Sequence, residues 1–146
     1  MEDKVKIELS PKQYEKLLET VFIGTWVVNS TKDELDESFE QVRNIVLSHS
    51  KEANAAEKVE YVADGDYYDL SVAYETALVD AFIEPYDEQA FFDKLIEKLA
   101  LKKLAEEVGG LSVPLSEEMI EKKLMYESEI EQGLYKYGLK PLDWKA

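Results

Sequence analysis

The chain contains no cysteine and only one histidine. The absence of cysteine excludes disulfides, thiolate nucleophiles and cysteine-ligated metals, and it fits a cytoplasmic protein. The sequence also lacks a phosphate-binding glycine loop, a G-x-S-x-G nucleophile turn and an H-E-x-x-H metal helix. No assembled catalytic set is present, so we favour a protein that is not an enzyme and predict no cofactor.

Long apolar runs are also missing. The longest stretch without a charged residue is 12 residues, 20–31, whereas a membrane-spanning helix needs about 20. The first ten residues have no apolar segment followed by a cleavage site, so we recognise no targeting segment. The sequence therefore predicts a protein that does not enter a membrane.

Basic residues are few. The chain has 17 lysines and arginines against 32 aspartates and glutamates, and its formal net charge is -15. Residues 1–73 carry 8 basic and 16 acidic groups, and residues 74–146 carry 9 and 16, so the charge is spread over both halves. Such a surface repels nucleic acid and anionic membranes over about 8 Å at physiological salt. We therefore expect no direct binding to nucleic acid.

Apolar residues are nevertheless abundant. They make up 45% of the 146 residues, which is enough for one hydrophobic core and too little chain for two large ones. The apolar positions recur mostly at three- and four-residue spacing, as in amphipathic helices. The sequence predicts a mainly α protein, in which residues 1–146 form a single domain with a bundle of about five helices.

We expect residues 11–29 to form the central helix. Ser10 can cap its free amides, and Pro11 suits the first helical position. Its first half is amphipathic, whereas the apolar residues of its second half, among them Trp26 and Val27, point in every direction around the axis. The sequence therefore predicts that neighbouring helices cover this second half on most sides.

Four further helices are expected around it. They cover residues 31 or 33 to 50, residues 71–84, residues 87–108 and residues 116–137, and Pro85 should end the second of them. One stripe of the first should pack on helix 11–29, and it consists of Leu35, Phe39, Val42, Val46 and His49. Leu139, Leu142 and Trp144 in the tail are apolar, and we expect them to lie back over the bundle.

Residues 4–9 alternate between apolar and charged side chains. Val5, Ile7 and Leu9 fall on one side, which is typical of a half-buried β-strand. A strand needs a partner for its backbone groups. Two partners are left open, namely residues 59–63 of the same chain or the equivalent strand of a second subunit.

Two groups of residues are candidates for chemistry. Asp64, Asp66 and Asp69 lie in one turn and could bind a hard cation, although their spacing does not match an EF-hand and we favour a solvated turn as their explanation. His49 and Glu52 are three residues apart and could act as a base or a metal ligand. The alternative for His49 is a structural position near the end of a helix.

Three functions remain open at this point. The leading hypothesis is protein–protein association, as a homodimer or with a protein partner, because the strand, the tail and an excess of 9 tyrosines suit interfaces. The second is a small metal-dependent hydrolase with Asp64, Asp66 and Asp69 as ligands and His49 as base. The third is an acidic mimic of nucleic acid, which the interleaved basic residues disfavour.

Overall fold

The computed structural model describes residues 2–140 and 142 of the chain. The described part is mainly helical and contains one two-stranded sheet, which confirms the predicted α class. The chain divides into two compact units, Met1–Pro85 and Tyr86–Ala146. The single domain over residues 1–146 stays a prediction. No described helix is long and apolar enough to cross a membrane.

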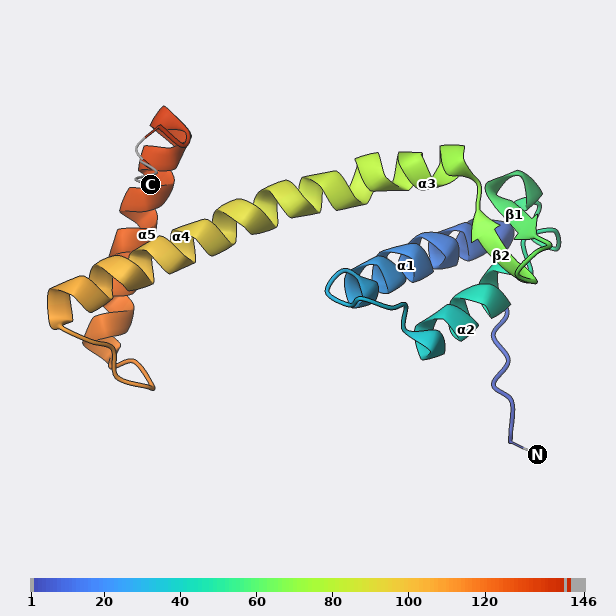
Figure 1. Ribbon diagram of the computed structural model, residues 1–146, viewed down its shortest axis with the longest axis horizontal. Coiled ribbons are helices and arrows are strands. Elements are labelled where there is room, and N and C mark those ends of the chain that lie inside the picture. The colour runs from blue at the N-terminus through green and yellow to red at the C-terminus, as the bar shows by residue number, and fades with distance from the viewer. Residues whose placement is uncertain (1, 141, 143–146) are drawn as a thin grey trace. The chain divides into compact units, whose positions relative to one another are not determined.

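The first unit combines helices with a β-hairpin. Its elements are α1 (Pro11–Asn29), α2 (Glu37–Leu47), a 3₁₀ turn (Ala56–Lys58), β1 (Val59–Val62), β2 (Tyr67–Leu70) and α3 (Val72–Leu78). Helices α1 and α2 lie side by side, and the hairpin lies beside the start of α1 and the end of α2 (Figure 1).

Helix α1 begins and ends where the sequence predicts. Ser10 and Gln13 form a reciprocal capping box, in which each side chain accepts a hydrogen bond from the other residue's backbone amide. The expected cover of its second half is wrong, because Trp26 is 40% and Val27 52% exposed. The buried residues follow one stripe along the helix and are Tyr14, Leu18, Phe22 and Thr25. Neighbours therefore pack against α1 mainly on one side.

The core of the first unit joins its helices and its hairpin. Leu18 and Phe22 of α1 pack with Leu47 of α2, Leu70 of β2 and Leu78 of α3. The Tyr14 hydroxyl donates a 2.6 Å hydrogen bond to the carbonyl of Val46. This bond ties the start of α1 to the end of α2.

Helix α2 packs through a different face from the one predicted. It starts later than expected, because Asp36 accepts hydrogen bonds from the amides of Ser38 and Phe39 and so caps it. Of the predicted stripe only Val46 packs against the core, whereas the others, Leu35, Phe39, Val42 and His49, are exposed. Leu47 and Arg43 face inward instead. These residues are spaced as on one side of a helix, but the prediction that this side packs on α1 is wrong.

The strand pair of the described chain is a hairpin, which differs from both pairings that the sequence left open for residues 4–9. Strand β1 pairs antiparallel with β2, and Tyr61 stands opposite Tyr68. Residues 4–9 form no strand in the described chain, so their predicted pairing with residues 59–63 of the same chain is wrong. Pairing β1 with β2 is favoured over pairing it with residues 4–9, because the hairpin closes only a short loop and so costs little chain entropy.

Pro85 does not end a helix. Helix α3 continues through a π-helical turn (Val79–Ile83) into α4 (Glu84–Val108). The amide of Glu84 bonds to the carbonyl of Val79, five residues back. Proline lacks an amide hydrogen and its ring crowds the carbonyl four residues back, so the wider π turn accommodates it. The predicted break at Pro85 is therefore wrong.

The second unit contains most of α4 and the whole of α5 (Glu117–Tyr137). The two helices share a small core of Ala100, Leu104 and Tyr126. Lys122 and Glu107 form an ion pair of 3.2 Å between them. In the predicted tail, Leu139 and Leu142 are exposed, and Trp144 lies outside the described residues.

Candidate functional site

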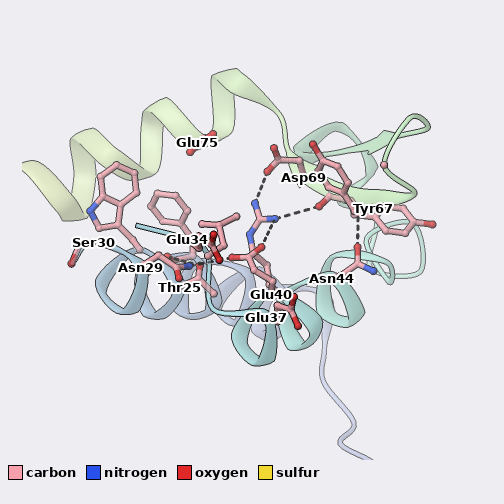
Figure 2. A pocket seen from close by; sticks show the side chains of 16 residues that line it. Thr25, Asn29, Ser30, Glu34, Glu37, Glu40, Asn44, Tyr67, Asp69 and Glu75 are labelled. Carbon is pink, nitrogen blue, oxygen red and sulfur yellow. Dashed lines mark hydrogen bonds and ion pairs between the residues drawn. The ribbon is translucent and has the colours of Figure 1, made fainter. Parts of the chain in front are cut away.

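A cleft of the first unit has a volume of about 1280 Å³. Its wall is built from the end of α1, the following loop, α2, β2 and α3 (Figure 2). Thr25 and Asn29 come from α1, Glu37 and Glu40 from α2, and Glu75 from α3 (Figure 2). The cleft therefore forms only once these elements have packed together.

Arg43 holds one side of this cleft in place. Its guanidinium donates to the Asp69 carboxylate and, at 3.3 Å, to the Tyr68 carbonyl, and it lies 3.9 Å from a Glu40 oxygen. The neighbouring Asn44 side chain accepts a 2.8 Å hydrogen bond from the Tyr68 amide. Two successive residues of α2 thus bind the outer edge of β2.

The floor of the cleft is fixed by a second set of hydrogen bonds. The Asn29 side chain accepts from the Asp36 amide at 2.8 Å and donates to Glu40 at 3.2 Å. Asp36 in turn accepts from Lys32 and Ser38, and these bonds hold the pKa of its carboxyl well below the usual range. The start of α2 is therefore anchored to the end of α1.

Acidic and aromatic side chains dominate the lining. The acids are Glu34, Glu37, Glu40, Asp69 and Glu75, and Arg43 is the one basic residue in the lining. Phe22 and Trp26 form a tilted pair with ring centroids 5.7 Å apart. Since the charge of Arg43 is already engaged by Asp69 and Glu40, the cleft has no unengaged cation among its lining residues.

The two aliphatic hydroxyl groups of the cleft, those of Thr25 and Ser30, are engaged with the backbone. Thr25 donates to the Val21 carbonyl at 2.8 Å, and Ser30 donates to the Val27 carbonyl at 2.7 Å. A nucleophilic hydroxyl needs a base within hydrogen-bond reach. The structure pairs neither Thr25 nor Ser30 with such a base.

The three aspartates of the predicted acidic turn do not meet at one site. Asp69 pairs with Arg43, and Asp66 accepts a hydrogen bond from the Tyr61 hydroxyl, which raises the pKa of Tyr61. Asp64 is exposed. Within residues 2–140 and 142, no three carboxylate or imidazole groups gather in a way that could hold a metal ion. The geometry gives this turn no support as a metal centre.

His49 and Glu52 do meet, as their spacing suggested. The His49 Nδ1 atom lies 2.9 Å from a Glu52 oxygen, and both side chains are more than half exposed. Neither residue lines the cleft. The pair therefore lies on an open surface, where water competes with any proton transfer.

The sequence analysis missed an exposed apolar surface of the first unit. Four apolar side chains on α2 or just before its cap are 44–64% exposed. We call them the α2 stripe: Leu35, which also lines the cleft, Phe39, Val42 and Ile45. Their spacing was visible in the sequence. Spacing alone does not say whether an apolar stripe faces the core of its own chain or another molecule.

Comparison of the chain with protein-family models, curated proteins and solved structures finds no match.

Proposed function

We propose that this protein acts by protein–protein association and that its first partner is a second copy of itself. The observation that carries the proposal is the α2 stripe. Contiguous exposed apolar side chains are uncommon on monomers and mark surfaces that bind other proteins. An excess of tyrosine, which suits interfaces, supports it further.

The energetics favour contact through the stripe. Fully burying one large aliphatic or aromatic side chain contributes roughly 1.5–3 kcal/mol. The stripe itself carries no charge, whereas the first unit as a whole has 19 acidic and 8 basic residues. Two such units repel each other, so an uncharged apolar face is where copies can meet at least electrostatic cost.

A two-fold dimer would place the same stripe on both sides of the interface. Such isologous contacts are the commonest form of self-association. Phe39, Val42 and Ile45 recur every three residues and cover one side of α2. Two copies of this helix could therefore pack stripe against stripe.

The proposal is tested by charging the stripe. Val42→Lys should raise the dimer dissociation constant at least tenfold, because dimerisation would then desolvate an ammonium group without a partner. Gln41→Lys is the matched control, since it adds the same charge to an exposed neighbour on the same helix. Sedimentation equilibrium of the full chain measures both constants against the unmodified protein.

Two results would overturn the proposal. One is a mass of 16.8 kDa for the unmodified chain at every concentration tested. The other is a Val42→Lys variant that dimerises as tightly as the control. Thermal melting of both variants checks that the fold is retained, as expected for substitutions at exposed positions.

A further inference from the structure

The two outer edges of the hairpin differ. The edge of β2 is covered by α2, because Asn44 accepts from the Tyr68 amide at 2.8 Å and Arg43 donates to the Tyr68 carbonyl at 3.3 Å. The Leu70 amide on this edge bonds to the Asp69 side chain at 2.8 Å. The Tyr68 amide and carbonyl and the Leu70 amide, which point away from β1, are therefore engaged.

The edge of β1 is open. The Ser71 amide bonds to the Lys58 carbonyl at 2.8 Å, so residues 58 and 71 face each other through hydrogen bonds. Hydrogen-bonded pairs alternate along an antiparallel ladder, which turns the peptide groups of Tyr61 away from β2. The described chain offers these groups no hydrogen-bond partner. Such an edge is a template for another strand.

The segment before α1 has the matching pattern. Residues 4–9, which we call the arm, form neither helix nor strand, and Val5 and Ile7 are 88% and 75% exposed. The arm leaves the unit in a fixed direction, because the capping box holds Ser10 and Pro11 restricts Ser10 to an extended conformation. Figure 1 shows it projecting away from the hairpin and helices of the first unit.

We propose, on the basis of the self-association argued above, that the arm of one copy adds to the β1 edge of a second copy as a third strand. Because side chains alternate across a strand, the apolar side of the arm would lie beside Val59 and Tyr61. Its other side would bring Lys4 and Lys6 beside Glu60. Backbone pairing, apolar contact and charge then agree in one arrangement.

A small pocket on the same face of the sheet supports this arrangement. It has a volume of about 210 Å³ and is lined by Val59, Tyr61 and Tyr68 together with Ser50, Lys51 and Ala56. A strand added at β1 with its apolar side on this face brings Ile7 or Val5 to the pocket. In the described chain, Lys4 and Lys6 have no acidic partner within 4.0 Å, so both remain available for Glu60.

A proline in the arm tests the backbone pairing. Ile7→Pro removes a ladder donor and an apolar contact, and the dimer dissociation constant should rise at least tenfold. Glu2→Pro, in the same N-terminal segment but outside residues 4–9, should leave the constant unchanged. Both changes should leave the unit folded, because Ile7 is 75% exposed and no residue of the arm belongs to the core.

Cross-linking between two single-cysteine chains tests the place of contact, and the natural absence of cysteine makes it clean. A mixture of Lys6→Cys and Glu60→Cys chains, treated with a short bismaleimide, should give a product containing one of each. Lys6→Cys with Thr76→Cys, an exposed position on α3, is the control and should give little product.

The outcomes separate this inference from the proposed function. If the unmodified chain dimerises but Ile7→Pro and Glu2→Pro behave alike, or the 6–60 product does not exceed the control, the arm exchange is wrong and self-association stands. A chain that carries both Lys6→Cys and Glu60→Cys and cross-links only within itself also contradicts the exchange. A monomeric unmodified chain overturns both.

Discussion

Two tyrosines, the buried Tyr14 and the partly buried Tyr74, show how single residues set the chemistry of the first unit. Burial raises the pKa of Tyr14 to about 12, with a smaller contribution from Glu52, and burial likewise raises the pKa of Tyr74 to about 12, with Glu19 and Glu15 adding to it. The Tyr14 hydroxyl donates to Val46, whereas the Tyr74 hydroxyl is buried without a partner among the described residues. Both side chains favour the neutral phenol in the folded state.

These pKa values predict a loss of stability at alkaline pH. An acid whose pKa is higher in the folded state stabilises the fold below its unfolded pKa of 10, and this stabilisation is lost as the pH rises through about 12. The free energy of unfolding, measured with urea, should therefore fall between pH 10 and about 12. In a Tyr14→Phe, Tyr74→Phe double variant the fall should be smaller. An equal fall in both proteins would contradict the assignment.

At the scale of elements, the joint between α2 and β2 determines which surfaces remain open. Arg43 and Asn44 turn one face of α2 toward the strand, and this rotation leaves Phe39 and Val42 outside. The same contacts close the β2 edge and leave β1 as the open side of the hairpin. Both surfaces proposed for association therefore follow from one joint.

Removing one side of this joint gives a prediction for stability. Asn44→Ala leaves the Tyr68 amide without its acceptor, which should cost about 1–3 kcal/mol of unfolding free energy. Gln41→Ala, at an exposed position of the same helix, should change it by less than about 0.5 kcal/mol. Chemical denaturation of both variants measures the difference. Equal unfolding free energies for the two variants would mean that the bond from the Tyr68 amide to Asn44 does not stabilise the β2 edge.

Sequence patterns predicted elements better than their orientation. Ser10 and Pro11 fixed the start of α1 because capping is a local interaction. The direction of the α2 stripe depends on Arg43 contacting a strand 25 or more residues away, which periodicity does not encode. Pro85 misled for a related reason, since the π turn that accommodates it lies outside the usual helical pattern. The cleft is likewise assembled from distant segments.

At the scale of the molecule, the negative charge is concentrated rather than even. The first unit has 19 acidic and 8 basic residues, whereas the second has 13 and 9. Equal halves of the sequence concealed this difference, because the boundary between the units falls after Pro85. Association through the first unit therefore works against repulsion that salt can screen.

Screening of this repulsion by salt should affect the dimer dissociation constant. The Debye length falls from about 10 Å at 0.1 M salt to about 3 Å at 1 M. Repulsion between two first units should weaken accordingly, so the dimer should be tighter at the higher salt concentration. A dimer that dissociates on adding salt would mean that ion pairs, rather than the apolar stripe, hold it together.

Sedimentation equilibrium of the unmodified chain over the micromolar range, at both salt concentrations, tests self-association most directly. We predict an average mass that rises above 16.8 kDa as the protein concentration increases. In the higher salt, this rise should begin at a lower protein concentration. A mass of 16.8 kDa at every concentration in both salts would contradict the account.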